Sequence, residues 1–138
     1  MNDIYDEARR RLATATLDWT AIDLMLTAWR GTPTFVPTDK TINDVIAHGN
    51  STVAAYSLPI VTKDVAVDGT AQTDEVVLPD VAIGAPITHF TMCQRNVVPE
   101  SGQLILFIDN AEGLPFIPNG LDMVIKPDWL QNKGWFRA

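Results

Sequence analysis

Few residues of this chain have the types and spacing that metal or acid–base chemistry requires. The two histidines, His48 and His89, lie far apart, and neither has a second histidine at the spacing of a zinc site. His48 precedes Gly49, which fits a helix C-terminus, where an imidazole meets free carbonyl groups. His89 falls within a predicted strand, where we expect a hydrogen-bonded or surface position. We therefore expect no metal site built on histidine.

The patterns of nucleophilic catalysis and nucleotide binding are missing as well. Ser51, Ser57 and Ser101 are the only serines, and the sequence contains no Gly-x-Ser-x-Gly, no Gly-x-Gly and no Gly-Lys-Ser/Thr. Cys93 is the only cysteine, so neither a disulfide within the chain nor a cysteine cluster can form. Its position in an apolar stretch predicts a buried, unreactive thiol.

Acidic residues offer the remaining candidates for chemistry. The run Asp109–Gly113 resembles part of a calcium loop, but Ala111 interrupts the alternating oxygen donors that such a loop needs, and a turn is the better interpretation. Neighbouring acids such as Asp74 and Glu75 are typical of a solvated surface. The sequence therefore predicts no catalytic residue, no metal and no cofactor, and a protein that is not an enzyme.

Composition excludes several other classes of protein. With 138 residues, 46% of them hydrophobic and 20% charged, the chain is expected to fold as one globular domain. The formal net charge of −7 would repel a polyanion, so nucleic acid is not an expected partner. No apolar stretch reaches the length of a membrane span, and the N-terminus carries acids in place of a signal peptide, so we expect a soluble protein without a membrane partner.

The first residues predict a short helix over about 3–13. Asp3 can cap it, and Ile4, Ala8 and Leu12 have the spacing of one apolar helix face. Acids stand in its first turn and Arg9–Arg11 in its later part, as the helix dipole favours. We interpret the arginines as a solvated face, with a contact to an acidic neighbouring subunit as the alternative.

Strand patterns dominate the chain after residue 20. Polar and apolar residues alternate from Thr20 to Trp29, with Met25 and Trp29 on a second, partly covered face. Prolines make 31–38 a loop, and Thr41 caps a brief helical turn that ends at Gly49. Six further strands are predicted between turn signals, over 52–58, 63–67, 74–78, 87–93, 104–109 and 121–125.

About seven short strands without a crossover helix predict a mainly β fold, an antiparallel β-sandwich or a barrel-like domain with a short N-terminal helix. We expect one domain over 1–138, consisting of an N-terminal helix (1–14), a β-sandwich (18–126) and an aromatic C-terminal tail (127–138). The strand around 104–108 is apolar on both faces, as for a strand covered on each side, with another subunit sealing one face as the alternative.

The aromatic rings of the C-terminal tail would be costly to leave in water. We expect them to contact a neighbouring subunit, with packing on the chain's own core as the alternative. Together with the arginine cluster they form the predicted interface: Arg9, Arg10, Arg11, Trp129, Trp135 and Phe136.

Several motifs in order resemble a family of small structural proteins encoded by tailed bacteriophages. They are Tyr5-Asp6-Glu7-Ala8-Arg9, Leu17-Asp18-Trp19 before a strand, Ile108-Asp109, Gly113-Leu114-Pro115 and Pro118-Asn119-Gly120. Each motif alone is a generic helix start or turn, and the resemblance rests on their order and spacing over most of the chain. The chain departs from the family pattern at Leu121-Asp122 and in the tail over 129–138.

The resemblance implies a structural role in the virion and no enzymatic activity. The leading hypothesis is a capsid decoration (cement) protein, assembled in the bacterial cytoplasm, that contacts major capsid protein or other virion proteins and is a homo-oligomer on the particle. The alternative is a tail, neck or fibre-associated module that binds a receptor, in which tryptophans could stack on sugars. A small hydrolase or lyase is a third, less favoured hypothesis.

Overall fold

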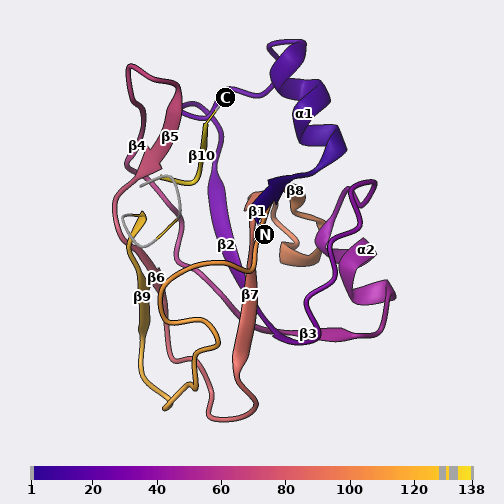
Figure 1. Ribbon diagram of the computed structural model, residues 1–138, viewed down its shortest axis with the longest axis vertical. Coiled ribbons are helices and arrows are strands. Elements are labelled where there is room, and N and C mark those ends of the chain that lie inside the picture. Colours follow the sequence, from indigo (N-terminus) through magenta and orange to yellow (C-terminus); the bar gives the residue numbers. More distant parts are fainter. Residues whose placement is uncertain (1, 128–129, 131–133, 138) are drawn as a thin grey trace.

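The largest element of the fold is a five-stranded antiparallel sheet. The computed structural model describes residues 2–127, 130 and 134–137. The strand order of the sheet is β1-β8-β7-β2-β3 (Figure 1), with bounds Asn2–Ile4, Gln103–Ile108, Ile87–Gln94, Leu24–Gly31 and Ser51–Tyr56. The mainly β fold with antiparallel pairing predicted from the sequence is confirmed.

Two smaller sheets lie on one side of this sheet. One has the order β10-β5-β4, with bounds Phe136–Arg137, Thr70–Thr73 and Lys63–Val65, and the other pairs β6 (Val76–Leu78) with β9 (Met123–Ile125). Figure 1 shows both beside the central strands β2 and β7, on the side away from helix α2. The finer prediction of a sandwich or barrel is not confirmed, because the strands that face the large sheet belong to two separate sheets.

Residues of alternating strand positions divide the core into two clusters. Leu24, Leu26 and Ala28 of β2 belong to the larger cluster, which the small sheets complete with Val76, Leu78 and Ile125, among others. Met25 and Trp29 point the other way, into a smaller cluster. A strand buried on both faces needs apolar residues at nearly every position, and residues 24–29 are all buried. The predicted second face of this strand is therefore confirmed.

The smaller cluster is covered by the segment that follows β2. Helix α2 (Ile42–Ala47) buries Ile42 and Val45, whereas Ile46 is exposed. The α2 N-terminus has the predicted cap, since Asp44 Oδ2 accepts hydrogen bonds from the backbone nitrogens of Lys40 (2.8 Å) and Thr41 (3.1 Å).

The N-terminal helix is shorter than predicted and is not capped by Asp3. Helix α1 spans Asp6–Ala13 with Tyr5 at its N-cap, while Asn2–Ile4 form the edge strand β1 paired with β8. As part of β1, these residues form backbone hydrogen bonds with β8. In a longer helix their N–H groups would lie in the first turn, where such groups have no partner within the helix. The Asp3 carboxylate instead accepts hydrogen bonds from Ile4 N (2.8 Å) and from Arg9.

All seven predicted strands are present, and the largest error is at the start of β2, which begins at Leu24 and not at Thr20. The predicted strand at 104–109 is β8, and its two faces are sealed by the two clusters of the chain itself. Sequence patterns missed β1, β5 and β10. A short 3₁₀ helix, η1 (Pro99–Ser101), joins β7 to β8, and no helix of the described part is long and apolar enough to span a membrane.

Candidate functional site

The arrangement closest to catalytic machinery is a histidine–aspartate pair at the end of α2. Nε2 of His48 lies 3.0 and 2.8 Å from the two carboxylate oxygens of Asp39, which is largely buried. Within the described residues, no hydroxyl or thiol is hydrogen-bonded to this imidazole. A base without a nucleophile in reach cannot activate one. The pair links the C-terminus of α2, where His48 was predicted, to the preceding loop.

The other histidine and the cysteine belong to the core. The His89 ring stacks on Trp29, with centroids 5.9 Å apart and 7° between planes, and its Nδ1 lies 2.8 Å from Thr88 Oγ1. Burial lowers the pKa of His89 to about 4, so the imidazole is neutral at pH 7. Burial also raises the pKa of Cys93 to about 12, and its thiol donates to Met25 O at 3.4 Å. The predicted inert core thiol is confirmed.

Metal-ligand groupings are equally missing from the described residues. No group of three or more His, Cys, Asp or Glu side chains there is placed to hold a metal ion. At the predicted turn after β8, Asn2 Oδ1 accepts hydrogen bonds from the backbone nitrogens of Asp109 (3.2 Å) and Asn110 (3.1 Å). The side-chain amide of Asn2 in β1 therefore holds the start of this turn.

The predicted arginine cluster is a surface with partners on its own chain. Arg9 pairs with Asp3, Arg10 Nε donates to Glu7 Oε2 at 3.1 Å, and Arg11 donates to Gln103 Oε1 at 2.9 Å. The side chains of Arg9 and Arg10 are 54% and 62% exposed. These contacts agree with the interpretation as a solvated face, since exposed ion pairs contribute little binding energy of their own.

Two of the three aromatic residues predicted at the interface are part of the core instead. Trp135 and Phe136 are 2% and 5% exposed. The Trp135 indole donates to Thr73 Oγ1 at 2.8 Å, and Phe136 packs edge-on against Trp19 with centroids 5.3 Å apart. The expectation that these two rings contact another subunit is therefore wrong, because β10 pairs with β5 and turns them inward. The third predicted ring, Trp129, lies outside the described residues.

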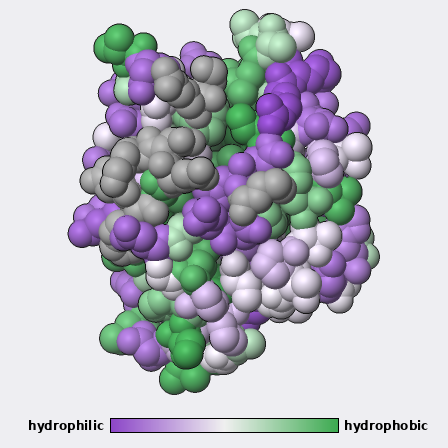
Figure 2. Space-filling view, viewed as in Figure 1, coloured by the Kyte–Doolittle hydropathy of each residue, from purple (hydrophilic) through white to green (hydrophobic). Residues whose placement is uncertain are grey.

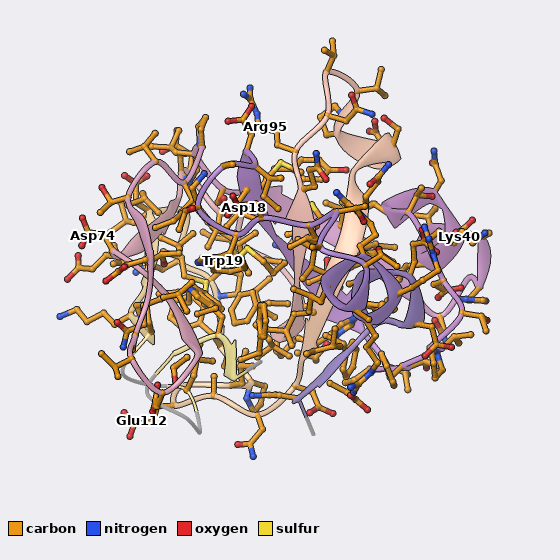
Figure 3. All side chains as sticks on the ribbon, turned by 90° about the horizontal axis from the view of Figure 1, so that it is seen from above. Asp18, Trp19, Lys40, Asp74, Arg95 and Glu112 are labelled. Carbon is orange, nitrogen blue, oxygen red and sulfur yellow. The ribbon has the colours of Figure 1, made fainter. Side chains whose placement is uncertain are left out.

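Burial of the tryptophans also bears on the sugar-binding alternative. Trp19 and Trp29 are 4% and 0% exposed, so with Trp135 three of the four tryptophans lack a free face for stacking. Figure 3 shows Trp19 pointing into the interior, whereas Asp74, Arg95 and Glu112 project outward.

An exposed apolar surface lies at one end of the molecule, where the sequence predicted turns and, from Leu121 on, a strand. Ile83, Ile117 and Leu121 are 76%, 72% and 67% exposed. They stand on the loop between β6 and β7 and on the long connection from β8 to β9, which both reach the lower end in Figure 1. Figure 2 shows hydrophobic side chains gathered there. We call these three residues the apolar tip.

Backbone hydrogen bonds hold the two loops of the apolar tip together. Val81 N donates to Leu121 O (3.2 Å), and Gly120 N donates to Val81 O (3.0 Å). Asp80 N donates to Asp122 Oδ1 at 2.9 Å. Gly120 has φ +86°, and a methyl group added there would contact Ile83. The exposed apolar side chains therefore lie on two loops that are held together by hydrogen bonds.

Sequence patterns missed this surface because Ile83 and Ile117 belong to no periodic segment, and because Leu121 was assigned to a strand that begins only at Met123. Ile83 directly precedes Gly84, and Ile117 directly precedes Pro118. A large apolar residue directly before a turn residue was the signal that could have found these two.

Comparisons with known proteins give no relative from which a function could be transferred. No family model matches the chain, and neither a curated protein nor a solved structure is significantly similar to it.

Proposed function

We propose that this chain is a structural protein of a tailed-bacteriophage virion, and specifically a capsid decoration protein whose apolar tip contacts the major capsid protein. The observation that carries the proposal is the apolar tip itself. Large aliphatic side chains exposed together on a fixed surface are typical of a protein–protein contact, where burial removes them from water.

The order of motifs supports the virion context. Gly113-Leu114-Pro115 and Pro118-Asn119-Gly120, two of the motifs that resemble the phage family, lie in the loop that carries Ile117 and Leu121. In such a protein the same segment would serve as the contact surface. Prolines restrict the backbone of this loop before binding, which reduces the entropy lost on association, and Gly120 permits the positive φ that the turn requires.

A tail- or neck-associated structural protein is the second candidate, because the apolar tip fits any virion partner with an apolar surface. The glycan-binding form of this alternative is less favoured, since three of the four tryptophans are buried. The number and position of copies on the particle separate the head from the tail.

Charge-introducing variants at the apolar tip test the proposal. We expect Ile117→Asp and Leu121→Asp to reduce incorporation into particles at least about tenfold, which corresponds to about 1.4 kcal/mol, and to leave thermal stability unchanged because both side chains are in water. Val97→Asp is the matched control. Val97 is 97% exposed and follows the C-terminal end of β7, whereas Ile83 of the apolar tip precedes the N-terminal end. The seven residue steps between the two ends of β7 span about 23 Å.

Incorporation is measured by quantitative mass spectrometry of purified particles. Normal incorporation of both tip variants would refute the contact, and absence of the wild-type chain from particles would refute the virion role.

A further inference from the structure

A pocket beside the apolar tip has the chemistry of a binding site. Its volume is about 420 Å³, within the range of ligand sites in proteins. It lies between the connection that follows β8 and strand β9, and Phe90 of β7 lines it as well. Its lining is mostly apolar, with two acidic residues: Phe90, Glu112, Gly113, Leu114, Phe116, Asp122, Met123, Val124 and Ile125.

The pocket runs along an edge of β9 that is not paired with any described strand. Residues 122–125 all line it, although successive side chains of a strand point to opposite sides, so the pocket follows the edge of β9. In the described part of the chain, β9 is hydrogen-bonded to β6 alone, and no residue of β6 lines the pocket. An unpaired edge next to an apolar slot is suited to an extended peptide, which can pair with the strand and place a side chain in the slot.

Charge selects which side chain fits best. Glu112 and Asp122 are both exposed and line the pocket, and Figure 3 shows Glu112 projecting outward. Neither carboxylate belongs to an ion pair within the described residues. Asp122 uses one oxygen to accept a hydrogen bond from Asp80 N. A lysine or arginine satisfies both parts of the lining, because its aliphatic stem packs on apolar walls while its charged end reaches the carboxylates.

We propose that this pocket binds a lysine or arginine side chain carried by an extended segment of a neighbouring virion protein. The identity of the partner rests on the proposed function, whereas the preference for a cation with an apolar stem follows from the pocket alone. The neighbouring apolar tip would extend the same contact.

Small probes test the preference without any partner. Hexylammonium, hexanoate and hexanol share one apolar stem and differ in charge, and each is titrated into the ¹⁵N-labelled protein. We expect hexylammonium to shift the amide resonances of Leu114, Met123 and Ile125 and to bind at least about tenfold more tightly than hexanoate. Equal binding of the three probes, or no shift at the lining, would overturn the proposal.

Two double variants tie the preference to the named carboxylates. Glu112→Gln with Asp122→Asn should abolish the discrimination between the amine and the alcohol, while the side-chain amide oxygen introduced at position 122 can still accept from Asp80 N. Asp23→Asn with Glu100→Gln removes the same charge elsewhere and should keep the discrimination. A preference that persists in the first double variant would contradict the proposal.

The same variants are then compared on particles. We expect the pocket double variant to lose at least about tenfold in incorporation, and the control pair to incorporate normally. If the probes bind as expected but the pocket variant incorporates normally, the pocket is not a partner contact. If the wild-type chain is missing from particles while the probes still bind, the virion role fails and the chemistry of the pocket stands.

Discussion

Acidification should destabilise this protein through His89. The ring is 1% exposed, stacks on Trp29 and lies next to Phe107. In the folded state water therefore cannot stabilise the charged imidazolium. Burial lowers the pKa from 6.5 to about 4, and the negative charge of Asp109 opposes only part of this effect.

The sign and size of the effect follow from proton linkage. Because the folded pKa lies below that of the unfolded chain, the unfolded state binds more protons between pH 6.5 and 4. The contribution of His89 is therefore complete above pH 6.5 and is lost as the pH falls toward 4. At about 1.4 kcal/mol for each pH unit, the loss reaches about 3 kcal/mol, a large fraction of the stability of a small protein.

Urea denaturation at several pH values between 7 and 4 measures this loss. Other groups titrate in the same range, so the comparison is with His89→Gln, which cannot become charged. We expect the free energy of unfolding of the wild type to fall more steeply than that of the variant, with a difference of about 3 kcal/mol accumulated by pH 4. Parallel curves for the two proteins would refute the argument from burial.

Three other predictions concern the core and a helix cap. Trp135→Ala should lower the free energy of unfolding by about 3–5 kcal/mol, because the ring is buried and its indole donates to Thr73; a loss below about 1 kcal/mol in urea denaturation would mean that the ring is not in the core. Cys93 should react with a thiol reagent only on unfolding, and rapid reaction of the native protein would contradict its burial. Asp44→Ala should lower the free energy of unfolding by about 1 kcal/mol, since two backbone nitrogens lose their hydrogen-bond acceptor. Asp44→Asn should retain most of the stability, and thermal denaturation of the two variants measures the difference.

Two of the strands that sequence patterns predicted are marked by their composition. Residues 104–108 are all apolar, residues 24–29 are apolar except Thr27, and the turns between strands are rich in glycine and proline, so local composition places these elements. Strands β1, β5 and β10 depend on their partners. The segment Thr70–Thr73 has no alternating pattern and becomes a strand because β4 and β10 lie on either side of it.

For Trp135 and Phe136 the predicted interface is wrong, because tertiary packing decides their exposure. Trp135 and Phe136 follow Gly134 near the chain end, where terminal residues are usually frayed, and this position suggested an external contact. Their actual environment includes Ala71 and Trp19, which are distant in sequence. The apolar tip was missed because its residues are distant in sequence. Hydrogen bonds between two loops bring Ile83 and Leu121 together, and no periodic pattern describes these loops.

A cryo-electron microscopy reconstruction of purified particles tests the proposed capsid role. We expect copies of this chain on the outside of the head, arranged with the symmetry of the capsid lattice, with Ile83, Ile117 and Leu121 against the major capsid protein. Particles without density for the chain, or with the chain attached through another surface while the apolar tip faces solvent, would contradict it.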